Sequence, residues 1–173
     1  DPADVSRTIR GWHYGRYPAT RSATARERLT EFVPALIETL SSAENADAAL
    51  GAFDRFLGRL PAGVQLFSLL NSNPELLGLL VTMLASAPRM SQTVIQRAHV
   101  LDALIEPAFF GRVPKRKELA ERLKMTLAEA DGYEDVLDRA RIFGQEQAFL
   151  IGVRVLAGTL DARQAGVTFA DLA

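Results

Sequence analysis

The sequence contains no cysteine and only two histidines, His13 and His99. Without cysteine there is no disulfide framework, no thiol nucleophile and no thiolate metal site. The two histidines lie far apart in the chain, so we expect no metal site around them. His99 precedes Asp102 by three residues, and we interpret it as a hydrogen-bonded residue at a helix start rather than a catalytic base.

Long apolar runs and an excess of one charge are also missing. The longest apolar run, Leu76–Ala87, is interrupted by Gly78 and Thr82 and is too short to cross a bilayer. No basic segment followed by an apolar one opens the chain, so no signal peptide is visible. The net charge of −1 argues against a dedicated nucleic-acid binder. We therefore expect a cytoplasmic globular protein whose partners include neither nucleic acid nor membrane.

The motifs of phosphate chemistry are absent as well. A nucleotidyl-transfer site needs closely spaced carboxylates to hold Mg²⁺ against phosphates, and the sequence has no Asp-x-Asp pair. Gly58 and Gly63 have the spacing of a P-loop, but Val64 and Gln65 stand where its Lys-Ser/Thr should follow. We assign no catalytic, cofactor-binding or metal-binding residue, and we expect the chain alone to be inactive.

What the sequence does have is helical periodicity. One buried face is expected at Leu29, Phe32, Val33, Leu36, Ile37 and Leu40, which follow the i, i+3, i+4, i+7 pattern. A second helix should start at Asn45 or Asp47, either of which can cap it, and stop before Pro61. Its buried face is expected at Leu50, Phe53, Phe56 or Leu57, and Leu60.

Several short helices should follow over residues 64–110. Asn73 can cap one of them, and Pro74 and Pro88 suit first helical turns, whereas Pro107 and Pro114 mark breaks. A long helix should begin at Tyr133 and present Tyr133, Val136, Leu137, Ala140, Phe143, Leu150, Ile151, Val155 and Leu156. Gly144 and Gly152 within it predict close backbone packing. No segment shows the alternation of a strand, so we predict an all-α, multi-helix bundle of short helices plus one long C-terminal helix.

The segment Gly11–Ser22 interleaves aromatic and basic side chains on what should be an irregular loop, because Gly11, Gly15 and Pro18 break any regular period. Three interpretations fit it: binding of phosphate or an acidic partner, stacking on single-stranded nucleic acid, or a linker whose aromatics pin it to the helices. We favour the linker. The candidate contact residues, toward a partner or another domain, are Trp12, His13, Tyr14, Arg16, Tyr17 and Arg21.

Charge is distributed unevenly near the C-terminal end. Residues 112–124 hold six basic and two acidic residues, net +4, whereas residues 129–146 hold six acidic and two basic residues, net −4. We interpret them as solvated helix faces that attract one another across a turn at Met125–Ala128. Docking patches are the alternative.

Four blocks of this chain, in order, resemble the glutamine synthetase adenylyltransferase family. Gly11–Ser22 resembles the junction after the family's first catalytic half. The other blocks are Leu60–Leu70 with Asn73–Leu77, then Ala87–Arg89 with Arg97–Leu104, and finally Gln147–Arg154 with Leu156–Gly158. The last of them resembles the long helix just ahead of the family's second catalytic core.

The resemblance implies an enzyme with two nucleotidyltransferase cores, which transfers AMP from ATP to a tyrosine of glutamine synthetase and removes it, using ATP and Mg²⁺. The helical region between the cores is implicated in responding to glutamine and to the PII signal protein. The present chain resembles that region and lacks the metal-carboxylate signatures, so no catalytic residue can be carried over to it. The implied partners are the flanking catalytic domains, glutamine synthetase and PII.

The ends of the chain predict a piece of a longer protein. The chain opens on Asp-Pro rather than Met. Thr168–Asp171 is typical of a capped helix start, and the chain ends before such a helix is complete. We expect residues 1–22 to form a linker loop from a preceding domain, and residues 23–173 a central helical domain ahead of a following catalytic core. The expected function is a non-catalytic linker and regulatory domain. The alternative is a passive scaffold or protein-interaction module without a regulatory ligand.

Overall fold

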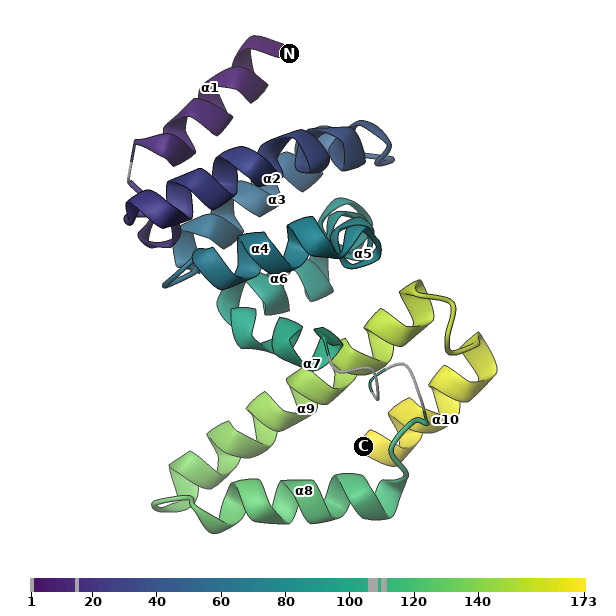
Figure 1. Cartoon of the computed structure of the whole chain (residues 1–173). Coiled ribbons are helices and arrows are strands. Elements are labelled where there is room, and N and C mark those ends of the chain that lie inside the picture. The colour runs from purple at the N-terminus through teal and green to yellow at the C-terminus, as the bar shows by residue number, and fades with distance from the viewer. Residues whose placement is uncertain (1, 15, 106–108, 110–111) are drawn as a thin grey trace. The chain divides into compact units, whose positions relative to one another are not determined.

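The computed structural model describes residues 2–14, 16–105, 109 and 112–173 (Figure 1). Every regular element within these residues is a helix, which confirms the all-α class. The chain forms two compact units, residues 1–99 and 100–173. The predicted division into a linker and a helical domain at residue 22 stays a prediction.

The first unit is built from helices that pack in pairs. Its elements are α1 (Pro2–His13), η1 (Pro18–Thr20), α2 (Ala23–Ser41), α3 (Ala46–Arg59), α4 (Val64–Ser72), α5 (Pro74–Ser86) and α6 (Pro88–Gln96). Helix α2 packs on α4, and α3 packs on both α5 and α6. The short 3-10 turn η1 lies against α2 and α3.

Buried aromatic rings form the centre of this first unit. The Phe53 ring centroid lies 5.5 Å from that of Trp12, 6.0 Å from Phe32 and 5.9 Å from Phe56. Phe32 stacks in turn on Phe67 of α4 at 5.9 Å. These five side chains are fully buried, and aromatic pairs at such separations stabilise a core beyond the area they bury.

Local signals set most helix boundaries in this unit. Asn45 caps α3 by accepting a hydrogen bond from the Ala48 backbone N–H at 3.0 Å, as predicted. Pro74 and Pro88 are first-turn residues of α5 and α6, also as predicted. Asn73 occupies the N-cap position of α5 as expected, but its side chain does not cap the helix, because its amide donates to the Leu69 carbonyl at 2.8 Å.

The predicted faces of α2 and α3 are largely confirmed. The expected residues of α3 and its C-cap, Leu50–Leu60, are buried on the apolar side, as are Leu29, Phe32, Leu36 and Leu40 of α2. Ile37 is the error, with 43% of its surface exposed. Val33, also expected on this face, is half-buried, so the buried stripe of α2 is narrower than the pattern suggests.

The second unit contains α7 (Asp102–Ile105), α8 (Arg116–Ala128), α9 (Tyr133–Leu156) and α10 (Ala162–Leu172), and the 3-10 turn η2 (Ala98–Leu101) leads into it. Helices α8 and α10 both pack on α9 and on each other. Ile151, Leu160 and Ala165 form a small buried cluster, with Val113 and Leu172 packed against it. The predicted long C-terminal helix is therefore confirmed with its predicted start.

Several details of the second unit differ from the prediction. Four of the residues expected on the buried face of α9 are exposed: Tyr133, Leu137, Val155 and Leu156. The buried face of α9 is therefore narrower than predicted. Thr168–Asp171 lies inside α10, whose true start is Asp161 with its capping partner Gln164. Residues 125–128 are the last turn of α8, not a turn between helices.

The expectation at Gly144 is wrong, and the one at Pro107 falls outside the described residues. A Cβ at Gly144 would meet no atom within 4 Å, so close backbone packing does not explain that glycine. Pro107 lies outside the described residues, and so do Gly15 and the side chain of Asp102, the expected neighbour of His99. His99 itself is an exposed residue of η2.

Candidate functional site

Two aromatic side chains of the N-terminal segment converge on one carboxylate of α3. The indole Nε1–H of Trp12 donates to Asp54 Oδ1 at 2.8 Å, and the phenol of Tyr17 donates to the same oxygen at 2.6 Å. Trp12 is completely buried, so its ring has no surface left for a partner. These bonds anchor α1 and η1 to α3, which is the pinning role that the linker interpretation assigned to the aromatics.

The environment of Tyr17 disfavours its ionised form. Burial, followed by the hydrogen bond to Asp54 and the negative charge of that carboxylate, raises the pKa of Tyr17 to about 12, while Arg16 acts in the opposite direction. Tyr17 therefore stays a hydrogen-bond donor across the physiological range. Asp54 was not singled out from the sequence. The available signal was a carboxylate next to Phe53 and close to Phe56, in a helix turn that otherwise faces the core.

The loop predicted over residues 11–22 is helical at its start, because α1 continues to His13 and Pro18–Thr20 form a 3-10 turn. His13 ties α1 to α2: its Nδ1 lies 3.1 Å from the Ile9 carbonyl oxygen and its Nε2 lies 3.1 Å from Thr30 Oγ1. Gly11 sits in regular helix and does not break it. The irregular part of the segment is shorter than expected.

Three of the six candidate residues point to solvent. Tyr14 is 76% exposed, and Arg16 and Arg21 are exposed as well. Among the described residues, Arg16 and Arg21 form no ion pair within 4 Å. Tyr14 and Arg16 line an open groove along α1 together with Arg10. The structure thus separates the candidates into a buried anchor, with Trp12 and Tyr17, and an exposed set.

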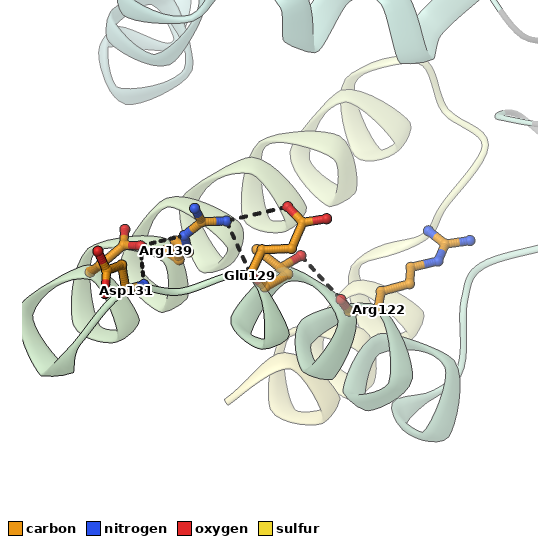
Figure 2. A network of polar contacts seen from close by, with 6 residues as sticks. Arg122, Glu129, Asp131 and Arg139 are labelled. Carbon is orange, nitrogen blue, oxygen red and sulfur yellow. Dashed lines mark hydrogen bonds and ion pairs between the residues drawn. The ribbon is translucent and has the colours of Figure 1, made fainter.

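The charged segments of the second unit pair mainly within themselves. Arg139 forms ion pairs with Asp135 at 2.9 Å and with Glu129 at 3.6 Å, and it donates to the Thr126 carbonyl at 3.3 Å (Figure 2). Arg112 pairs with Glu118 at 2.5 Å. The bonds of Arg139 therefore brace the α8–α9 turn at residues 129–132. Attraction between the two charged segments as wholes stays a prediction.

Two further features of the described residues bear on function. Within residues 2–14, 16–105, 109 and 112–173, no three His, Asp or Glu residues lie close enough together to hold a metal ion. In the same part of the chain, no helix is both long and apolar enough to cross a membrane.

Comparisons with known proteins agree on one family. Residues 77–173 match the family model of glutamate-ammonia ligase adenylyltransferase. Three similar proteins, each named bifunctional glutamine synthetase adenylyltransferase/adenylyl-removing enzyme, come from Mesorhizobium japonicum, Brucella suis and Agrobacterium fabrum. They are 54%, 52% and 52% identical to this chain over 99% of its length.

The chain spans about 17% of the length of those three relatives. No solved structure matches it significantly. The family model covers more than half of the chain, including all of α6 to α10, and the relatives extend the similarity over α1 to α5. The chain therefore belongs to the glutamate-ammonia ligase adenylyltransferase family.

Proposed function

We propose that this chain is a non-catalytic helical region that joins and couples two catalytic halves of a bifunctional enzyme. That enzyme transfers AMP from ATP to a tyrosine of glutamine synthetase and removes it again, in the cytoplasm. The observation that carries this proposal is the length relation: 99% of the chain aligns with only 17% of a relative whose name gives both activities. The helical character of every regular element described supports a connecting role.

The family implies ATP and Mg²⁺, and the described residues do not offer a set of ligands for that metal. Mg²⁺ in phosphoryl-transfer sites is held by carboxylates together with substrate phosphates. No cluster of three potential ligands exists among the residues that the structure describes. We therefore assign ATP and Mg²⁺ to the rest of the enzyme and derive no chemical step from this chain.

The N-terminal segment would serve as a contact region toward a flanking catalytic domain or PII. Its buried anchor fixes the backbone through the two hydrogen bonds to Asp54, so the exposed side chains project from a held position. Tyrosine and arginine are enriched at protein interfaces because they combine large contact area with directed hydrogen bonds. Tyr14, Arg16 and Arg21 are such side chains, and all three are exposed.

Coupling between the catalytic halves requires two packings of the helices, with effector binding favouring one of them. An effector can shift such an equilibrium only by as much as its affinities for the two packings differ. In the full enzyme, the contact region would report that difference to a neighbouring domain.

The test combines Tyr14→Ala, Arg16→Ala and Arg21→Ala in a full-length enzyme that contains this segment. We expect the response of both activities to glutamine and PII to weaken while the unregulated rates and the melting temperature stay unchanged, because no buried group is removed. Arg59→Ala is the matched control, since Arg59 is an exposed arginine of the same unit outside the segment. An unchanged response in the triple variant would favour the passive scaffold.

Calorimetric titration of the 173-residue chain with PII, with and without glutamine, distinguishes a regulatory domain that binds PII from a passive scaffold that does not. Saturable heat that the triple variant loses would support the regulatory role. Adenylyl transfer by the chain alone should be undetectable, and measurable transfer would overturn the assignment as non-catalytic.

A further inference from the structure

An open groove of about 640 Å³ runs along α1, and the proposed contact role does not say which kind of partner it fits. Helix α1 lies at the edge of the first unit (Figure 1). The groove follows α1 from Ala3 to Gly11, which is eight residue steps or about 12 Å at 1.5 Å for each step. That length exceeds a single small anion and suits a segment of a protein chain.

Three arginines and a tyrosine border this groove. Arg7, Arg10 and Tyr14 are separated by three and four residues, the spacing that brings side chains to one side of a helix. Tyr14 directly follows α1 and is 76% exposed, and Arg16 lies on the same groove and is exposed too. Guanidinium groups and an exposed phenol ring are therefore available together to one partner.

The three arginines differ in the interactions that they already make. Arg7 pairs with Asp4 at 2.8 Å, and both side chains of this pair are more than half exposed. Within the part of the chain that the structure describes, the side chains of Arg10 and Arg16 form neither an ion pair nor a hydrogen bond. A guanidinium group has five N–H donors. Arg10 and Arg16 can thus offer all of theirs to a partner.

We propose that this groove binds an acidic segment of a protein partner, whose carboxylates pair with Arg10 and Arg16 while an apolar side chain packs on the Tyr14 ring. A planar guanidinium and a carboxylate match each other through two parallel hydrogen bonds. Clusters of arginine recognise acidic motifs in this way. The inference rests on the proposed contact role of the N-terminal segment and adds the chemistry of the partner.

Two other anionic ligands suit the groove less well. A small phosphate ester would meet only exposed arginines, where water and salt weaken each charge interaction. A nucleic acid would require a basic surface that a chain of net charge −1 is not expected to carry. An acidic segment engages both arginines and covers Tyr14 at the same time.

The experiment is a calorimetric titration of the 173-residue chain at low ionic strength with an acidic peptide, Glu-Glu-Leu repeated four times. The comparison peptide has Gln in place of each Glu, which keeps the shape and removes the charge. We expect saturable binding of the acidic peptide, weakened by added salt, and no measurable binding of the Gln peptide. Absence of saturable binding, or tighter binding of pyrophosphate than of the acidic peptide, would overturn the proposal.

Arg10→Gln combined with Arg16→Gln should weaken binding of the acidic peptide about tenfold, because each exposed ion pair contributes on the order of a factor of three. Arg59→Gln combined with Arg89→Gln is the matched control, since both are exposed arginines of the first unit outside the groove lining. The control should bind like the unaltered chain. An equal loss in both double variants would indicate attraction by general positive charge and would overturn the groove as the site.

Tyr14→Ala tests the apolar part of the contact. It should weaken binding of the acidic peptide and leave the salt dependence unchanged, because the ring contributes contact area and no charge. Its melting temperature should equal that of the unaltered chain, since the side chain is exposed. Full binding by this variant would overturn the role of the ring.

Failure of this inference and failure of the proposed contact role give different results. The first would be seen if the peptide does not bind while the triple variant at Tyr14, Arg16 and Arg21 still weakens the response to glutamine and PII. The partner would then not be acidic. The second would be seen if the peptide binds through Arg10 and Arg16 while regulation in the triple variant is unchanged.

Discussion

The two compact units solve the problem of burying apolar surface in different ways. The first unit encloses five large aromatic side chains in one connected core, and its N-terminal helix contributes Trp12 to it. In the second unit, Ile151, Leu160 and Ala165 form one buried cluster, and Phe143, Phe149 and Val153 of α9 are buried as well. This unit also carries most of the exposed large apolar side chains: Met125, Tyr133, Leu137, Val155, Leu156, Val167 and Phe169.

This difference teaches where each unit obtains its stability. The core of the first unit is completed within its own residues, since long side chains from several helices interlock there. The second unit leaves more of its large apolar side chains exposed and carries charged braces such as the Arg139 network. Apolar surface left outside a core is typical of regions that contact another domain or protein. This agrees with a chain that spans 17% of the length of its relatives.

The largest effect is expected from Trp12→Ala. Truncation removes a fully buried ring from the aromatic core and one hydrogen-bond donor from Asp54, so the free energy of unfolding should fall by about 3–5 kcal/mol. Urea denaturation followed by circular dichroism measures this loss. Tyr133→Ala is the counterpart in the second unit: its side chain is 77% exposed, and the change should stay within about 0.5 kcal/mol. Similar losses in both variants would break the comparison.

Alanine substitutions at two glycines, one in each unit, should have opposite effects on stability. A Cβ at Gly63 would lie 2.5 Å from the Ala19 carbonyl oxygen and collide with the Phe67 ring, so Gly63→Ala should cost about 1–3 kcal/mol. Gly144→Ala in α9 meets open space and should stabilise the second unit by up to about 1 kcal/mol. Thermal denaturation of both variants checks the opposite signs. Destabilisation by Gly144→Ala would show a packing constraint at that position.

The Tyr17–Asp54 hydrogen bond makes the first unit sensitive to alkaline pH. Because the folded state raises the pKa of Tyr17 from 10.0 to about 12, its contribution is complete below pH 10 and is lost as pH rises through 12. At pH 8, Tyr17→Phe should cost about 1.5 kcal/mol, the value for a hydrogen bond to a charged group. The difference between the two proteins in urea denaturation should shrink from pH 10 upward. A constant difference up to pH 12 would contradict the shift.

The smallest effects concern helix caps, one in each unit. Ser22 accepts a hydrogen bond from the Ala25 N–H at 3.0 Å, and Asp161 accepts one from the Gln164 N–H at 2.8 Å. Replacing either residue by alanine should cost about 1 kcal/mol. Amide hydrogen exchange distinguishes the units. Asp161→Ala should accelerate exchange locally in α10. Ser22→Ala should leave exchange in α2 slow, because the aromatic core holds that helix in place. Equally local effects in both variants would argue against the comparison.

Helix boundaries were predictable where one residue type decides the local backbone. Pro74 and Pro88 lack a backbone N–H, which the first turn of a helix does not need, and Asn45 offers an oxygen where α3 begins. Prediction was wrong where two signals competed. Thr168 precedes Asp171 as a capping box would, but the stronger box at Asp161 had already started α10. Gly11 is tolerated in α1 because the neighbouring Trp12 fastens that helix to the core.

The candidate site was predicted in part. The aromatic character of the N-terminal segment is visible in the sequence, and so is its proximity to basic residues. The sequence did not reveal which ring would be buried or that Asp54 would accept from both, since Trp12 and Asp54 are 42 positions apart. One pocket of the second unit, which Arg122 and Arg154 both line, was equally hidden, because these residues lie on different helices, 32 positions apart in the sequence.

The sequence by itself determined the helical class, most helix starts and ends, the absence of cysteine chemistry and the family resemblance, because these depend on nearest neighbours or on the order of residues. The packing of the helices decided that Tyr133 and Leu137 face solvent, that Trp12 is enclosed, and that three arginines line one cavity. The physical reason is that burial and electrostatic contact depend on which helices pack together. A periodic pattern on one helix indicates that a face should be covered, but the helix that covers it is set by the packing of the whole unit.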